Sequence, residues 1–158
     1  MGSGKNYWGE LWSEKIGFVF IDIDAKVELQ EKKSIAEIFA EEGEDHFRNL
    51  ETNVLRSFAD KSNIIVATGG GTACFNDNIT WMNENGVSIY LQSAPENILE
   101  RLVNEKEKRP LIRNLQNAEL LFYIREKIKE RETFYHQARI ILNVDDLTPD
   151  YIPDFLKK

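Results

Sequence analysis

The sequence has 158 residues, 42% of them hydrophobic and 30% charged, which fits one folded domain and excludes wholesale disorder. Its formal net charge of −7 argues against nonspecific nucleic-acid binding, which needs many basic side chains on one face. No apolar run approaches the roughly 20 residues that cross a bilayer, and the single cysteine, Cys74, cannot form an internal disulfide, so we expect a cytoplasmic protein without a membrane or nucleic-acid partner.

The amino end carries the second half of a phosphate-binding loop. Gly4-Lys5 matches the end of the pattern G-x-x-x-x-G-K-[ST], in which backbone amides and a lysine surround phosphate oxygens and a helix follows, here from about Lys5. By itself, Met-Gly-Ser-Gly is equally typical of a cloning remnant. The residues that follow, up to Asp22, nevertheless continue the register of a loop, a helix and the next strand.

Two features depart from a complete loop of this kind. A buried strand normally leads into the loop, and that strand is absent from the sequence, so we expect either a natural start farther upstream or an incomplete sheet with a poorly anchored first helix. Either outcome would weaken nucleotide binding. Asn6 stands where a serine or threonine hydroxyl ordinarily reaches Mg²⁺, and although its amide oxygen can ligate the ion, its longer arm predicts a poorer octahedral fit.

Farther along the chain, short apolar runs alternate with helical patterns, which is typical of βαβ units that build a parallel sheet. Ser34 with Glu37, and Ser93 with Glu96, have the spacing of capping boxes at helix starts. The predicted strands are residues 18–21, 64–67, 87–91 and 140–144, and the predicted helices after the first are residues 34–39, 45–58, 76–85, 95–103 and 118–133.

Candidate ligand-binding residues follow the predicted strands or lie on the predicted helices. Asp24, at the carboxyl end of a strand, can orient or deprotonate a substrate hydroxyl, with helix capping as the alternative. The three glycines at 69–71 follow another buried strand and let a ligand approach the backbone closely. Arg48 and Arg131 lie on separate helices, and each guanidinium can grip a carboxylate through two parallel hydrogen bonds, although a single helical arginine is more often solvated.

The stretch 104–117 is charged, contains Pro110 and lacks periodicity, which predicts a long exposed loop. Such a loop can act as a lid, a merely solvated connection being the alternative. On closure, Arg109 would bring its charge onto a transferring phosphoryl group and exclude water.

These motifs together resemble the shikimate kinase family from Met1 to about Phe155. The residues that carry the resemblance are Asp22-Ile23-Asp24, then Ser34-Ile35, Ile38-Phe39, Gly43-Glu44, Phe47-Arg48 and Glu51, then Gly69-Gly70-Gly71, Arg109-Pro110-Leu111, and Arg131 with Tyr135 and Ala138. The resemblance implies a three-layer α/β/α fold with a parallel sheet, like that of P-loop nucleoside monophosphate kinases. It would be a single domain over 1–158, with a substrate-binding helical segment at 25–60 and a lid at 104–117.

The resemblance also implies the reaction, which is ATP-dependent phosphorylation of the 3-hydroxyl of shikimate on the route to chorismate and the aromatic amino acids. ATP and Mg²⁺ would be the cofactors, and the protein would be a monomer. The implied catalytic residues are Asp24, Lys5 and Arg109; those around shikimate are Asp24, Arg48, Gly69, Gly70, Gly71 and Arg131; those around the nucleotide are Gly2, Ser3, Gly4, Lys5, Asn6, Arg109 and, beside the adenine, Pro149; and those toward Mg²⁺ are Asn6 and Asp22.

Two other functions remain open from the sequence. Asn6 and the missing strand are compatible with a relative that binds shikimate or nucleotide without turnover. A P-loop kinase for another small acid, such as gluconate, would share the phosphate-binding residues. Arg48 together with Arg131 argues only against a neutral acceptor.

Overall fold

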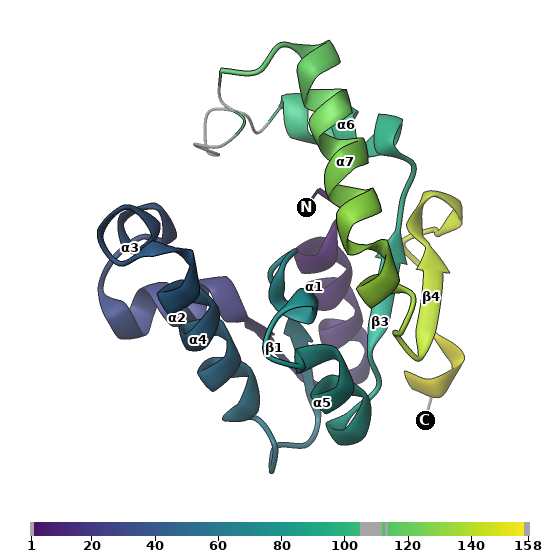
Figure 1. Cartoon of the computed structure of the whole chain (residues 1–158). Coiled ribbons are helices and arrows are strands. Elements are labelled where there is room, and N and C mark those ends of the chain that lie inside the picture. Colours follow the sequence, from purple (N-terminus) through teal and green to yellow (C-terminus); the bar gives the residue numbers. More distant parts are fainter. Residues whose placement is uncertain (1, 105–111, 113, 157–158) are drawn as a thin grey trace.

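The computed structural model describes residues 2–104, 112 and 114–156. Helices and short parallel strands alternate along the chain, as the sequence predicts (Figure 1). The elements are α1 (Lys5–Ile16), β1 (Val19–Asp22), α2 (Ile23–Glu31), α3 (Ile35–Glu41), α4 (Gly43–Arg56), β2 (Ile64–Ala67), η1 (Thr72–Cys74), α5 (Asn78–Asn85), β3 (Ile89–Gln92), α6 (Pro95–Val103), α7 (Asn117–Tyr135), β4 (Ile140–Asn143), η3 (Val144–Asp146) and η4 (Asp154–Leu156).

The four strands form two parallel pairs. β1 pairs with β2, with Val19 opposite Ile64, and β3 pairs with β4, with Ile89 opposite Ile140. All four predicted strands are therefore present, with boundaries shifted by at most two residues, and their parallel pairing is confirmed. Among the described residues, however, neither β2 nor β3 has a second strand partner, so the expected single sheet is two separate pairs.

A cavity of about 610 Å³ is lined by residues of both pairs. Ile65 and Val66 of β2 line it together with Tyr90 of β3, and α1 contributes Gly9 and Trp12. Because residues of both β2 and β3 line this cavity, it marks the position of the gap between the two strand pairs. An incomplete sheet is one of the two outcomes that the sequence predicted.

Helix α1 is nevertheless well anchored, contrary to that part of the expectation. It packs on β1 and β2, and its two tryptophans, Trp8 and Trp12, are buried. The Trp12 indole nitrogen donates to the carbonyl of Tyr151, which ties α1 to the carboxyl-terminal segment. Large buried aromatic side chains contribute much of the packing energy of a core, so these contacts anchor α1.

The sequence predicted a helical segment at residues 25–60 but did not predict α2 as a separate helix. Helix α2 begins directly after β1 because the Asp22 carboxylate accepts hydrogen bonds from the backbone amides of Asp24 and Ala25. Only Ile23 and Val27 are buried along its nine residues, so the apolar pattern that predicts a helix is short. In Figure 1, α2, α3 and α4 lie together on one side, and α6 and α7 lie on the other.

One of the two predicted capping boxes is present. Ser34 and Glu37 cap α3 reciprocally, as expected. The prediction for Ser93 was wrong, because the cap of α6 is Ala94 and its side chain makes no capping bond. Asp145, distant in sequence, accepts from both the Ser93 hydroxyl and the Ala94 amide and takes the place of a local cap.

The helices of the two sides bury their apolar faces in different clusters. Phe47 and Val54 of α4 belong to the cluster beneath α2 and α3, whereas Leu120 and Ile124 of α7 pack against α6. Among the described residues, every helix is too short or too polar to span a bilayer.

Candidate active site

The predicted phosphate-binding loop, residues 2–4, lies directly before α1, as expected from the sequence. Gly2 and Gly4 have φ angles of 69° and 86°, in the left-handed region that favours glycine, and α1 begins at Lys5. A cavity of about 770 Å³ opens at this helix start. The predicted residues that line it are Gly2, Ser3, Gly4, Lys5, Asn6, Asp22, Asp24 and Pro149.

Asn6 and Asp22 are in direct contact in this cavity. The Asn6 amide nitrogen donates to Asp22 Oδ2 at 2.5 Å, while Asp22 Oδ1 accepts from the backbone amide of Asp24 at 2.8 Å. Both carboxylate oxygens of Asp22 are therefore engaged by the protein. The helix-capping role that the sequence offered as the alternative for Asp24 belongs to Asp22, two residues earlier.

The Asp24 carboxylate lies beside the glycine turn, which we define as residues 69–71. A β-carbon built at Gly69 would lie 3.0 Å from Asp24 Oδ1. Burial raises the pKa of Asp24 to about 6, and the negative charges of Glu51 and Asp22 add to the rise, while Lys5 opposes it. A carboxylate with this pKa accepts a proton more readily than an ordinary aspartate and is still ionised at pH 7.

The Arg48 guanidinium is buried against the same turn. It donates from Nη1 to Glu51 Oε2 at 2.6 Å and from Nη2 to Glu44 Oε1 at 2.8 Å, and a β-carbon at Gly71 would lie 2.7 Å from it. Burial alone would lower the pKa of Arg48, but the hydrogen bonds and charges of Glu51 and Glu44 raise it. The guanidinium is thus fixed in place and stays charged.

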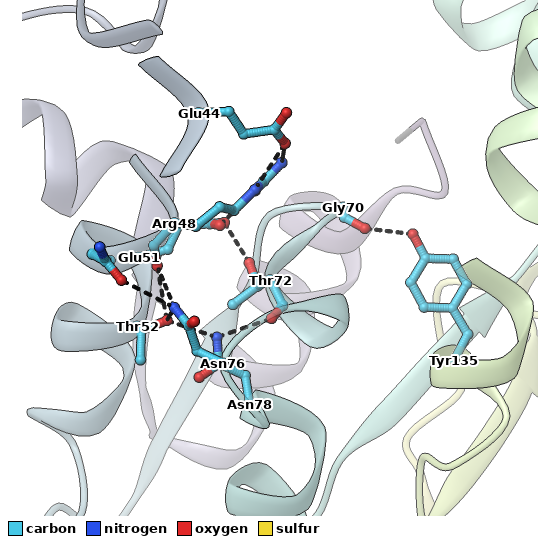
Figure 2. A network of polar contacts seen from close by, with 10 residues as sticks. Glu44, Arg48, Glu51, Thr52, Gly70, Thr72, Asn76, Asn78 and Tyr135 are labelled. Carbon is cyan, nitrogen blue, oxygen red and sulfur yellow. Dashed lines mark hydrogen bonds and ion pairs between the residues drawn. The ribbon is translucent and has the colours of Figure 1, made fainter. Parts of the chain in front are cut away.

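The buried Glu51 carboxylate links Arg48 to the segment after the glycines (Figure 2). Its second oxygen accepts a short hydrogen bond from the Thr72 hydroxyl, and both Glu51 and Thr72 are at most 1% exposed. A buried ion pair is stabilising only when its remaining hydrogen-bonding positions are filled, and Thr72 fills one of them. The hydrogen bonds from Thr72 to Glu51 and from Arg48 to Glu51 therefore fix the orientation of the guanidinium.

The glycine turn is needed for space and not for an unusual backbone conformation. None of the described positive φ angles falls at residues 69–71. Any side chain at Gly69 would overlap Glu51, and one at Gly71 would overlap Arg48. The glycines therefore let α2 and α4 bring their charged side chains against the backbone of the turn.

Arg131 reaches this region from α7. It lines the cavity of about 610 Å³ together with Gly69, Gly70 and Tyr135. The Tyr135 hydroxyl donates to the Gly70 carbonyl and lies beside Arg131. The two cavities share Ser3, Lys5 and Thr68 in their walls, so the cavity at the start of α1 adjoins the cavity beside the glycine turn.

The structure thus gathers nearly all the predicted site residues around one turn and one helix start. Arg109 lies outside the described residues. Glu51 and Tyr135, which belong to the motifs that carry the resemblance but had no predicted role, hold the charged groups in place together with Thr72. For Glu51 a signal was available, since it is three residues from Arg48 on one helix, whereas Thr72 has no local pattern that marks it.

A second group of residues without a predicted role lies in the wall of the cavity at the start of α1. Arg101 donates to Asp145 at 3.0 Å, and Asp145 also accepts from Ser93 and Ala94. Hydrogen bonds from these groups lower the pKa of Asp145 although its burial would raise it. These contacts join α6 to η3 along one wall of the larger cavity.

Comparison with known proteins gives one family throughout. The family model described as "Shikimate kinase" matches residues 1–157. The shikimate kinase of Azobacteroides pseudotrichonymphae is 39% identical over 160 residues, which is 100% of this chain and 94% of the relative. That of Bacteroides thetaiotaomicron is 37% identical and covers 93% of this chain and 84% of its own length.

Solved structures agree with the sequence relatives. The crystal structure of the Bacteroides thetaiotaomicron shikimate kinase has a TM-score of 0.89 at 37% identity and covers 93% of this chain and 84% of its own. The shikimate kinase from Acinetobacter baumannii, in complex with shikimate, has a TM-score of 0.84 at 29% identity and covers 94% of this chain and 82% of its own. The predicted α/β kinase fold is confirmed by these neighbours.

Proposed function

The chain belongs to the shikimate kinase family and is a transferase, and from this premise we propose that it moves the terminal phosphoryl group of ATP to the 3-hydroxyl of shikimate. The observation that carries the proposal is the glycine turn, against which one basic carboxylate and two guanidinium-bearing helices converge. An acceptor that is both an acid and an alcohol matches these charges. The reaction would supply shikimate 3-phosphate to the chorismate route.

In this proposal Arg48 and Arg131 bind the carboxylate of the acceptor. A guanidinium offers two parallel donors to a carboxylate. A buried guanidinium has already lost most of its water, so little further desolvation is needed when it binds the acceptor. The relative from Acinetobacter baumannii was solved with shikimate, which supports an acid of this class. Gly69, Gly70 and Gly71 keep the turn thin enough for the acceptor ring to lie beside it.

Asp24 acts on the acceptor hydroxyl, and Lys5 acts on the phosphates. The raised pKa of Asp24 suits a group that takes the hydroxyl proton as the phosphoryl group arrives. Lys5 and the backbone amides after Gly2, Ser3 and Gly4 would hold the phosphate oxygens, with Pro149 at the adenine. Arg109 is expected to stabilise charge on the transferring group, as the resemblance implies.

Asp22 and Asn6 are the residues that would hold Mg²⁺. A magnesium ion needs one or two protein oxygens and takes its other ligands from water and phosphate, so the Asp22 carboxylate beside the loop fits the ion. The ion would neutralise charge on the phosphates. Asn6 fits less well, because its amide nitrogen, and not its oxygen, faces Asp22.

The proposal is tested by an acceptor panel in a coupled ADP assay. We expect shikimate to be phosphorylated and gluconate to be inert. Arg131→Met should raise the KM for shikimate at least about 10-fold, because a charged hydrogen bond to the carboxylate is lost. Arg125→Met, an exposed change on the same helix, is the matched control and should leave KM unchanged.

Two results would contradict the proposal. Activity on gluconate with shikimate inert would assign the chain to another small acid. Shikimate binding without turnover, unchanged in Asn6→Ser, would favour a binding protein, a function that the contact between Asn6 and Asp22 supports. We also expect a cytoplasmic monomer without nucleic-acid partners, which gel filtration and cell fractionation would test.

A further inference from the structure

The two arginines proposed to bind the acceptor are carried by separate parts of the molecule. Arg48 lies on α4, whose apolar face packs with α2 and α3, and Arg131 lies on α7, whose apolar face packs with α6. A carboxylate can be held by both only if the distance between these helices is fixed. Neither hydrophobic cluster extends from α4 to α7 and fixes it.

The segment that lies between the two helices is the glycine turn with η1, which contacts both of them. On the α4 side, the Thr72 hydroxyl donates to Glu51, and Glu51 pairs with Arg48. On the α7 side, the Tyr135 hydroxyl donates to the Gly70 carbonyl. Figure 2 shows these contacts on opposite sides of the turn.

Tyr135 is itself held firmly. Its ring packs on that of Tyr90, with ring centroids 4.9 Å apart and planes 30° from parallel. Burial raises the pKa of the Tyr135 hydroxyl, although the charge and hydrogen bond of Arg131 oppose the rise. The hydroxyl is therefore protonated at neutral pH and remains a donor to the Gly70 carbonyl. Tyr135 lies four residues after Arg131 on α7.

We propose that Tyr135 is a positioning residue that joins α7 to the glycine turn and so sets the place of Arg131 relative to Arg48. The inference rests on the proposed function, because it concerns the acceptor of that same site. Tyr135 does not bind the acceptor in this account. It acts through Arg131, by keeping the end of α7 against the turn.

Tyr135→Phe tests the inference, because it removes one hydroxyl and keeps the ring on Tyr90. We expect the Kd for shikimate, measured by calorimetry, to rise about 3–10-fold, while the Kd for ADP and the melting temperature change little. Tyr123→Phe, on the same helix and packed in the α6–α7 cluster, is the matched control and should leave the Kd for shikimate unchanged.

A double-mutant cycle separates positioning from a general structural effect. In the Arg131→Met background, Tyr135→Phe should cause no further loss of shikimate binding, because the residue through which it acts is already absent. Additive losses in the cycle would overturn the inference. So would an unchanged Kd for shikimate in Tyr135→Phe when the unsubstituted protein binds it.

The single cysteine gives a readout that needs no shikimate. Cys74 ends η1, its amide donates to the Gly71 carbonyl, and its side chain is partly buried. If Tyr135 holds the turn, a thiol reagent should label Cys74 several-fold faster in the Tyr135→Phe variant than in the unsubstituted protein. In Tyr123→Phe the labelling rate should not change. If the unsubstituted protein binds no shikimate and Tyr135→Phe still speeds the labelling of Cys74, the proposed function is contradicted but Tyr135 still holds the turn. Unchanged labelling would overturn the inference.

Discussion

The surroundings of single residues explain the opposite charge behaviour of Asp24 and Arg48 at this site. Asp24 has neighbours of its own charge, Glu51 and Asp22, and little water, so its ionised form is costly in the folded state. Arg48 is the reverse, because two carboxylates offset its burial. Two groups with opposite proton affinity therefore lie against the glycine turn. The Asp24 carboxylate readily accepts a proton, and the Arg48 guanidinium stays protonated.

Replacing Asp24 should separate activity from stability. Asp24→Asn removes the proton acceptor, so we expect kcat to fall about 10²–10⁴-fold. At pH 7 it also removes a buried charge, so the free energy of unfolding should rise by about 2–3 kcal/mol, since one pKa unit corresponds to about 1.4 kcal/mol. Urea titration and the coupled assay measure the two effects. A loss of both would contradict this account.

The pH dependence follows from the same residue. The folded-state pKa of Asp24, about 6, lies above its ordinary value of 3.8, so the folded state binds more protons between these values. This contribution to stability is complete below about pH 4 and is lost as pH rises through 6. Activity should run the other way, because kcat/KM needs the ionised form and should rise through about pH 6. Asp24→Asn should abolish both trends.

Asn6 has a measurable consequence for the metal. Its amide nitrogen donates to Asp22 Oδ2, so a Mg²⁺ ion held by that oxygen would have to displace the hydrogen bond. Asn6→Ser should tighten Mn²⁺ binding in the presence of ADP several-fold, followed by electron paramagnetic resonance, because the hydroxyl is a shorter ligand. Asn6→Ala, which supplies no ligand, is the control. Equal tightening in both variants would show that only the loss of the amide matters.

At the scale of elements, the glycine turn is where three helices meet. α2 presents Asp24 to it, α4 presents Arg48, and α7 presents Tyr135. The contacts of Asp24 and Arg48 depend on the absence of side chains at Gly69 and Gly71, and no residue of the turn has a positive φ angle. Substitutions here act by overlap and not by backbone strain.

Gly71→Ala tests this steric account. Its new methyl group would lie 2.7 Å from the Arg48 guanidinium, so Arg48 must leave its pairs with Glu44 and Glu51. We expect a loss of about 1–3 kcal/mol in the free energy of unfolding and a clear rise in the KM for shikimate. Gly86→Ala is the control, because its nearest neighbour is 3.8 Å away and its backbone is extended. Equal effects at both positions would contradict the account.

For the whole molecule, the dominant feature is the gap between the two strand pairs. β2 and β3 each lack a second partner among the described residues, and residues of both line the cavity of about 610 Å³. Strand edges leave backbone donors and acceptors unpaired, and an apolar cavity loses packing contacts. The same cavity reaches Lys5 and the glycine turn, so the gap adjoins the site.

A designed extension should fill this gap. A segment of about six apolar residues and a short glycine link, joined to the amino end, would supply one parallel strand between β2 and β3. Burial of three aliphatic side chains should add about 5–9 kcal/mol to the free energy of unfolding, measured in urea, and tighten ADP binding. An extension of equal length made of glycine and serine is the control. Equal stability in the two variants would contradict the expectation.

The sequence by itself determined the elements that have local patterns. Apolar runs predicted all four strands, and helical periodicity and the Ser34 cap predicted α3 to α7, because these signals lie within one turn or one strand. The separated motifs also determined the family. The helix α2 was missed because its apolar pattern rests on two buried residues.

Only the tertiary structure decided how the charged groups are held. Thr72 meets Glu51 across 21 residues, and Tyr135 meets Gly70 across 65, so no local pattern marks either contact. The replacement of a local cap by Asp145 and the raised pKa of Asp24 likewise come from groups distant in sequence or from burial. Contacts of this kind depend on the packing of whole elements, which spacing along the chain does not encode.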